Sequence, residues 1–434
     1  MAVTKSAIAV CLDPKILDFV KINGCASFVF PSKETHLYLG VKSPKEEPWI
    51  WKDFLTESVF KQYALPTQRN GVTECADCVT RKNILPFARW EELVEERISS
   101  LPKLLQLELL DVVRSVSIEI DKWIKEHTKF WREFSEIARS FLYDFQWNAL
   151  GKIDLMRTAR KLIINERVDI ISRNILATLY GLKDKIPIKD KLPDEIVEEF
   201  SNFSERDFTK PPTGIPFFLM QFNYTLQKDK FITLNPVEKE MYFEALLRME
   251  CLQYEDFPFF MSHMNDNESK ILFEYHAFKI LGLYFLDWPL QCKFLSAAEQ
   301  LLPYFTEREF RGMLRLIIYE RIMLRRKDFN YIDLLKEFWS LSPSKLKESI
   351  RTDSIYEPLM FIINFPVDEM FPNEKLLENY NEDCLTFNYH GVKYILGRNG
   401  IRKDDFKVAH LFDPPRAFIN LFICDKYFES ETLM

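Results

Sequence analysis

The chain has 434 residues, of which 47% are hydrophobic, 28% charged and 15% aromatic. This composition is too apolar for a disordered chain, and the length allows about two or three domains or one elongated array. The net charge of -7 at pH 7 excludes a general electrostatic attraction to nucleic acid or to anionic lipid, so that any such contact has to be local.

Residues 1–102 contain seven of the 22 prolines and are expected to form a mixed N-terminal region. Two apolar runs, at residues 26–30 and 36–41, flank the sequence Pro-Ser-Lys-Glu-Thr, which is typical of a turn. The composition of the two runs predicts a β-hairpin near the N-terminal end of the chain.

Cys75 and Cys78 form the sharpest local motif of the sequence. Two thiolates three residues apart could bind one tetrahedral zinc ion or form a redox disulfide. A closed zinc site needs two more ligands, and the spacing of Cys11, Cys25 and His36 matches no zinc finger or ribbon. We therefore expect no cofactor and favour two ordinary loop thiols, with zinc at Cys75 and Cys78 as the alternative.

The part of the chain from residue 103 to 200 is expected to form long helices. No proline occurs at residues 103–186, and apolar residues recur there mostly three or four positions apart with charges between them. This spacing is typical of amphipathic helices. Glycine, at 11 of 434 residues, has roughly a third of its usual share, which also favours helices over a sheet-rich fold.

Helix start signals repeat along residues 201–372. Asn235 precedes Pro236, Thr306 and Glu309 have the spacing of a capping box, and Asn330 precedes an apolar periodic segment. The segments between residues 270 and 365 are about 10 to 20 residues long, with short joints, as in stacked antiparallel helix pairs. We expect an array of helical pairs over 201–372.

The helix expected after Thr306 carries an excess of basic residues. Pairs of arginines one helical turn apart could present a basic ridge to phosphate or to an acidic partner. The alternative is an ordinary solvated face opposite the apolar side of the helix. The partner-binding residues predicted from this pattern are Arg311, Arg315, Arg321 and Arg325.

Residues 373–434 are expected to form a C-terminal cap. The runs at residues 384–389 and 392–396 flank His390 and Gly391, a pattern that predicts a second β-hairpin.

Short catalytic motifs are missing from the sequence: no Gly-x-Ser-x-Gly, P-loop or His-Glu-x-x-His occurs. The longest apolar runs are far shorter than the roughly 18 residues of a membrane span, so we expect no membrane segment. The N-terminal residues do not have the pattern of a signal peptide, because Asp13 and Pro14 interrupt the apolar stretch. We therefore expect a cytoplasmic or nuclear protein.

The predicted fold is mainly α, an irregular array of stacked antiparallel helices resembling an α-solenoid, with minor β-hairpins near the N- and C-terminal ends. Such arrays bind other proteins along extended surfaces. The predicted function is a non-catalytic scaffold that binds another protein. The alternatives are a nucleic-acid-associated regulator that uses the basic helix at 308–327, and an enzyme whose site is assembled from distant residues.

Overall fold

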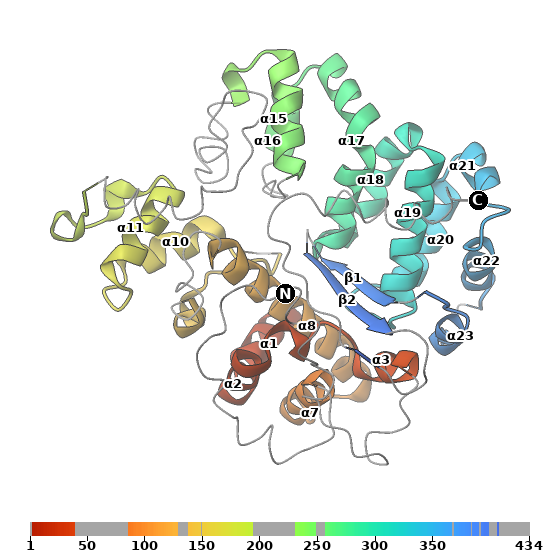
Figure 1. Ribbon diagram of the computed structural model, residues 1–434, viewed down its shortest axis with the longest axis horizontal. Helices are drawn as coiled ribbons and strands as arrows, with labels where there is room; N and C mark the ends of the chain where they lie inside the picture. The colour runs from red at the N-terminus through yellow and green to blue at the C-terminus, as the bar shows by residue number, and fades with distance from the viewer. Residues whose placement is uncertain are drawn as a thin grey trace. The chain divides into compact units, whose positions relative to one another are not determined.

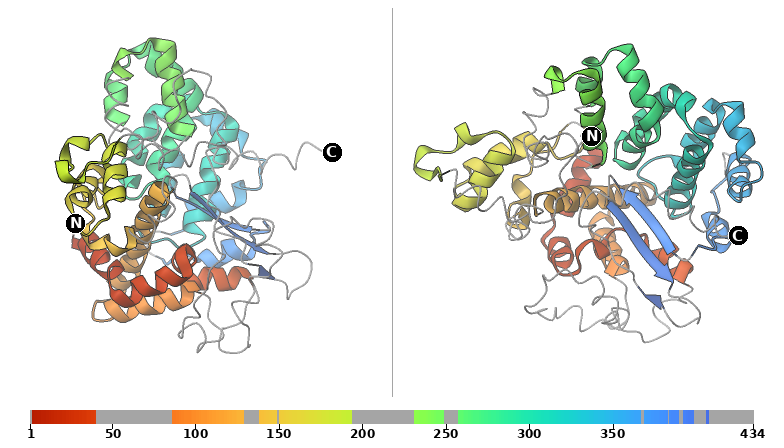
Figure 2. Two further views of the ribbon diagram at one scale, coloured as in Figure 1. Left: turned by 60° about the vertical axis from the view of Figure 1, so that its left-hand side comes forward. Right: turned by 45° about the horizontal axis from the view of Figure 1, so that its top comes forward.

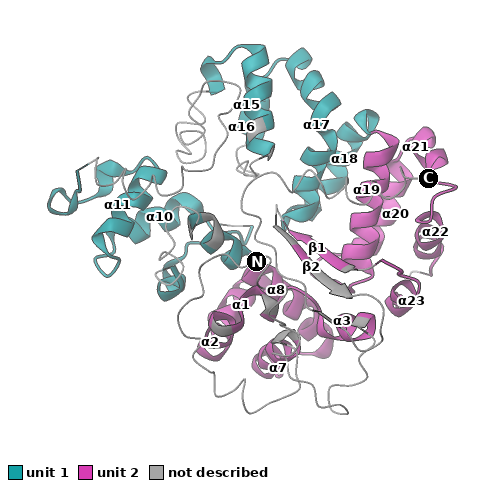
Figure 3. Ribbon diagram, viewed as in Figure 1, with its two compact units in different colours: residues 1, 119–305, 415–434 teal, residues 2–118, 306–414 magenta. Residues whose placement is uncertain are grey.

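The computed structural model describes residues 2–39, 86–128, 138–148, 150–193, 231–248, 257–366, 369–382, 384–389, 392–398 and 406–407. These residues are mainly helical, as the sequence predicts (Figure 1). The chain divides into two compact units (Figure 3). Unit 1 comprises residues 1, 119–305 and 415–434, and unit 2 comprises residues 2–118 and 306–414.

Unit 1 is built mainly of helices over its described residues. Aspartate side chains cap two of them, because Asp154 accepts a hydrogen bond from Arg157 N and Asp169 accepts one from Ser172 N. Asn265 and Glu268 form a capping box at the start of a third helix. The helices are the last part of α8 (Lys103–Thr128), α10 (Leu155–Ile164), α11 (Ile170–Leu179), α15 (Pro236–Arg248), α16 (Phe257–Ser262), α17 (Asp266–Leu286) and α18 (Phe294–Leu301).

Unit 2 combines helices from two distant parts of the chain. The predicted capping box of Thr306 and Glu309 is confirmed at the start of α19, and a π-helical turn, Ile318–Ile322, follows that helix directly. The helices are α1 (Ala2–Cys11), α2 (Pro14–Asn23), α3 (Ser32–Leu39), α7 (Pro86–Ile98), the first part of α8, α19 (Glu307–Ile317), α20 (Tyr331–Leu341), α21 (Ser344–Ser349), α22 (Tyr356–Ile363) and α23 (Asn373–Glu378).

The C-terminal hairpin predicted from the sequence is confirmed. Strands β1 (Cys384–Tyr389) and β2 (Val392–Arg398) pair antiparallel from Cys384 opposite Gly397 to Tyr389 opposite Val392. The short strand β3 (Phe406–Lys407) adds to the other edge of β2. The two long strands run side by side in every view (Figures 1 and 2).

The N-terminal hairpin prediction is wrong. Residues 24–27 form a 3-10 helix, and α3 contains residues 36–39 of the second predicted strand. The backbone between them is bound by side chains instead of a neighbouring strand, since Arg114 Nη1 donates to the carbonyl oxygens of Phe28 (2.6 Å) and Phe30 (3.2 Å). The carboxylate of Glu91 accepts the N–H of Ser32 (2.8 Å) at the start of α3. These long-range hydrogen bonds override the strand propensity of the run.

None of the helices that the structure describes is both long and apolar enough to span a membrane.

Candidate functional site

The turn between α7 and α8, together with the first turns of α8, exposes a group of leucines that we call the leucine surface. Its members are Leu101 (36% exposed), Leu104 (83%), Leu105 (44%) and Leu107 (46%). The turn itself is fixed, because Leu101 N donates to Ile98 O (3.0 Å) and Gln106 Nε2 donates to Leu101 O (2.6 Å). The exposed leucines are therefore held on an ordered corner of unit 2.

Two of these leucines lie on a face of α8 that is buried further along the helix. Leu104, Leu107, Asp111 and Arg114 follow one another at intervals of three or four residues, so they lie on one face of α8. Asp111 and Arg114 are buried, at 6% and 1% exposure, whereas Leu104 and Leu107 are exposed. The packing that covers this face at Asp111 thus does not extend back to the first turns of α8, where Leu104 and Leu107 lie.

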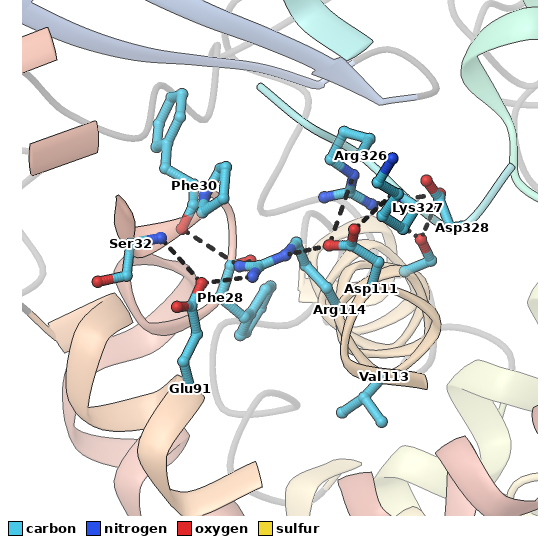
Figure 4. A network of polar contacts seen from close by, with 12 residues as sticks. Phe28, Phe30, Ser32, Glu91, Asp111, Val113, Arg114, Arg326, Lys327 and Asp328 are labelled. Atoms are coloured by element: carbon cyan, nitrogen blue, oxygen red, sulfur yellow. Dashed lines mark hydrogen bonds and ion pairs between the residues drawn. The ribbon is translucent and has the colours of Figure 1, made fainter. Parts of the chain in front are cut away.

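Arg114 is the centre of the contacts that cover α8 (Figure 4). Its guanidinium pairs with Glu91 of α7 through Nη2 (2.6 Å) and with Asp111 of its own helix through Nε (3.1 Å). The same guanidinium lies over the ring of Trp90, 5.2 Å from the centroid. Through these contacts and those to the carbonyl oxygens of residues 28 and 30, one side chain connects α7, α8 and the segment before α3.

The segment at residues 326–328 covers the other side of the same helical turn (Figure 4). Lys327 N donates to Asp111 Oδ2 (2.6 Å), and Ser115 Oγ donates to Asp328 Oδ2 (2.9 Å). Arg326 Nη2 lies 3.2 Å from Asp328 Oδ2 and 3.1 Å from Ser115 Oγ. We call the five ionic side chains of this region the charge cluster: Glu91, whose side chain is 16% exposed, and the more deeply buried Asp111, Arg114, Arg326 and Asp328.

Burial shifts the protonation equilibria of the charge cluster in different directions. Burial raises the pKa of Glu91 to about 7, although Arg114 and the N–H of Ser32 favour its charged form. Burial also acts to raise the pKa of Asp328, but the neighbouring Arg326 and further contacts outweigh it and hold the pKa below its usual value. Asp328 is therefore a charged partner of Arg326, while Glu91 titrates near neutral pH.

The π-helical turn joins the charge cluster to the hairpin. The Glu320 carboxylate accepts hydrogen bonds from Thr386 Oγ1 (3.0 Å), Asn388 N (2.6 Å) and Asn388 Nδ2 (2.6 Å). The guanidinium groups of Arg321 and Arg326 lie 4.3 and 4.9 Å from the ring centroid of Phe387. A π-helical turn adds one residue to a helix, and here both Glu320 and the following Arg321 are buried.

The four arginines predicted to bind a partner have different surroundings and do not form one ridge. Arg321 is 2% exposed and donates through Nη2 to Asn388 O (2.6 Å), so it is not on the surface. Arg311 pairs with Asp353 (2.9 Å), and Arg315 pairs with Glu382. Arg325 donates to the sulfur of Met370 (3.6 Å), and its charge acts to lower the pKa values of Glu34 and Glu374. Partner binding by Arg311, Arg315 and Arg325 stays a prediction.

The predicted zinc ligands Cys75 and Cys78 lie outside the described residues. Within the part of the chain that the structure describes, no three His, Cys, Asp or Glu side chains converge in a way that could hold a metal ion.

Sequence reasoning missed both the leucine surface and the charge cluster. A signal for the leucine surface was present, because Leu104, Leu105, Leu107 and Leu109 occupy more than one face of the same helix. An ordinary amphipathic helix carries its leucines on a single face. No comparable signal marked the charge cluster, whose members come from distant segments.

The charge cluster and the leucine surface differ in what they can do chemically. The charge cluster pairs two guanidiniums with three carboxylates and fixes the backbone of three segments, while the leucine surface can bury apolar side chains of another molecule. Comparison with family models, with curated proteins and with solved structures finds no match to this chain.

Proposed function

We propose that the protein is a non-catalytic helical scaffold of the cytoplasm or nucleus that binds another protein through the leucine surface. The observation that carries the proposal is the exposure of four leucines within seven residues, one in the turn before α8 and three at the start of that helix. Burying a leucine side chain stabilises a complex by about 1.5 to 3 kcal/mol, and contiguous exposed apolar side chains are typical of interaction sites. Stacked antiparallel helices, as in an α-solenoid, would give this corner its support.

The charges around the leucine surface indicate the chemistry of the partner. Glu95 and Glu108 are exposed next to the leucines in sequence, whereas Glu96 and Arg97 already pair with Arg89 (3.7 Å) and Asp13, respectively. Lys103 is the opposing basic residue. This acidic excess favours a protein segment that presents apolar side chains beside basic ones, since complementary charges steer association and disfavour wrong partners.

The charge cluster supports the same proposal by fixing α8 in advance. Asp111 and Arg114 hold the helix to two segments one to two turns after the leucine surface. A surface that is ordered before binding loses less conformational entropy when the partner arrives. The buried ionic contacts therefore contribute to affinity without touching the partner.

The proposal is tested by comparing Leu104→Asp with Ile188→Asp. Leu104 lies in the first turn of α8, where an acidic residue is favourable, so this change should preserve the fold. Ile188 is a matched control because it is also exposed, at 88%, but lies in unit 1. We expect Leu104→Asp to weaken binding of the identified partner at least about tenfold, the effect of a central interface residue.

Two steps make this measurement. The first step identifies proteins that co-purify with the wild type and with Ile188→Asp at high salt but are lost with Leu104→Asp. In the second step, each of these proteins is purified and its affinity for the wild type and both variants is measured by titration. Equal retention by both variants contradicts the proposal. A wild-type chain that only self-associates through Leu104, as seen by light scattering, contradicts it as well.

A further inference from the structure

One part of unit 1 carries a surplus of positive charge, although the chain as a whole is negative. Residues 138–193 contain eleven Lys and Arg residues against six Asp and Glu residues, whereas the net charge of the full chain is -7. One of the eleven, Lys152, is buried in an ion pair with Asp287. The other ten leave a surplus of four in α10, α11 and the turns around them, and the two helices lie side by side (Figures 1 and 2).

The solvent-facing side of α10 places cations around an exposed isoleucine. Arg157, Arg160, Lys161 and Ile164 follow one another at helical spacing, so they share one face, opposite the buried residues of the helix. The side chains of Arg157 and Lys161 are 71% and 43% exposed, and Ile164 is 61% exposed. Ile164 therefore lies in water within about one turn of two cations.

A second exposed apolar residue, Tyr143, is fixed to the same helix. Lys161 Nζ lies 3.1 Å from Asp144 Oδ1, and Asn165 Nδ2 donates to Asp144 Oδ2 (3.1 Å). Tyr143 directly precedes Asp144 and is 63% exposed, while Ile164 directly precedes Asn165. These contacts hold the 3-10 turn that contains Tyr143 against the C-terminal end of α10, with one exposed apolar residue on each.

The carboxylates of this region do not cancel its positive charge. Each already pairs with one cation: Asp154 with Arg157 (3.3 Å), Asp144 with Lys161 (3.1 Å) and Glu166 with Lys189 (3.3 Å). Arg160 and Arg167 are exposed too, and no carboxylate among the described residues lies within ion-pair distance of either. The guanidinium of Arg167 lies 5.5 Å from the ring centroid of Phe141 instead. We call this surface the basic corner: Tyr143, Arg157, Arg160, Lys161, Ile164 and Arg167.

We propose that the basic corner binds the surface of a membrane that contains anionic phospholipids. Apolar side chains that lie beside Lys and Arg enter the boundary between headgroups and acyl chains, while the cations meet the lipid phosphates. Tyrosine is favoured at this boundary, because its ring is apolar and its hydroxyl group stays hydrated. The local surplus of charge supplies the attraction that the full chain lacks.

The apolar side chains favour a membrane over a nucleic acid. A nucleic acid would bind the cations and could stack a base on Tyr143, but it would leave Ile164 in water. A membrane surface takes up both side chains. The basic corner lies in unit 1 and does not depend on the proposed role of the leucine surface.

Flotation of the full chain with lipid vesicles tests the proposal. We expect binding to phosphatidylcholine vesicles that contain about 30% phosphatidylserine, no binding to phosphatidylcholine alone, and weaker binding as sodium chloride is raised. The double variant Arg160→Gln, Arg167→Gln should bind at least about tenfold more weakly, because each cation near an anionic surface contributes about fivefold. Ile164→Ala should bind about three- to tenfold more weakly, because less apolar surface enters the lipid.

Matched controls come from another helix of unit 1. Lys270 and Ile271 are exposed on α17, so Lys270→Gln and Ile271→Ala should bind vesicles as the wild type does. Single-stranded RNA serves as the competing polyanion. The proposal would be overturned by absent binding to anionic vesicles, equal binding to neutral ones, unchanged binding of Ile164→Ala, or equal losses in the α17 variants. Tighter binding of RNA than of vesicles, unaffected by Ile164→Ala, would overturn it in favour of a nucleic-acid surface.

Discussion

At the scale of single residues, Arg114 has the largest structural role that we find in unit 2. It makes two ion pairs and two hydrogen bonds to backbone carbonyls while its side chain is 1% exposed. A buried guanidinium is stable only when its donors are satisfied, and here the acceptors come from three segments. The sequence identifies Arg114 as one charge in an amphipathic helix, but nothing local indicates that it is buried.

Because of Glu91, the partner of Arg114, we expect the stability of the folded protein to fall as the pH rises. Its pKa is about 7 in the folded protein against 4.5 for an ordinary glutamate, so the folded state binds the proton more tightly than the unfolded state. The resulting stabilisation is complete below about pH 4.5 and is lost as pH rises through about 7. We expect this group to lower the free energy of unfolding by about 2 to 3 kcal/mol across that range.

The measurement is urea unfolding between pH 4.5 and 7.5 for the wild type, Glu91→Gln and Glu92→Gln. Glutamine cannot titrate, so the free energy of unfolding of Glu91→Gln should vary less steeply with pH. Glu92 lies next in the chain and pairs with Arg89 on the surface, which makes it a matched control. Parallel pH profiles for the wild type and Glu91→Gln would refute this role.

At the scale of secondary structure elements, the two predicted hairpins show what a local pattern can predict. The runs at 384–389 and 392–396 pair with each other, since their turn is short and their strands can exchange hydrogen bonds directly. The similar runs at 26–30 and 36–41 do not, because Arg114 binds the backbone of the first run and Glu91 binds the N–H of Ser32 after it. Helix starts were predictable at Thr306 and Asn330, whose side chains act within one turn.

The connection between the π-helical turn and β1 is expected to stabilise unit 2. Glu320→Gln replaces a carboxylate oxygen by an amide group that also donates, so at least one of the donors from Thr386 and Asn388 loses its acceptor. The buried Arg321 next to it loses a neighbouring negative charge. We expect a loss of about 2 to 4 kcal/mol in the free energy of unfolding.

Chemical denaturation of Glu320→Gln is compared with that of Glu337→Gln. Glu337 is exposed on α20, and its substitution should change the free energy of unfolding by less than about 0.5 kcal/mol. A similarly small effect of Glu320→Gln would mean that the buried carboxylate does not hold β1 to the helix.

At the scale of the whole molecule, unit 2 depends on contacts between segments more than 200 residues apart. Lys327 N binds Asp111 across a sequence separation of 216 residues, and Ser115 binds Asp328 across 213. Helical periodicity and capping signals act within a few turns, so they predict the mainly helical composition but not which helices meet. The charge cluster follows from that pairing and could not be predicted from one sequence.

The proposed binding of another protein at the leucine surface is tested most directly by photo-crosslinking in cells of the source organism. A photoreactive amino acid replaces Leu104 in one variant and the equally exposed Ile188 in another. We expect a discrete covalent adduct at position 104, and not at position 188, with the crosslinked partner peptide carrying apolar and basic residues. No adduct at position 104, the same adducts at both positions, or a product formed by two copies of this chain would contradict it.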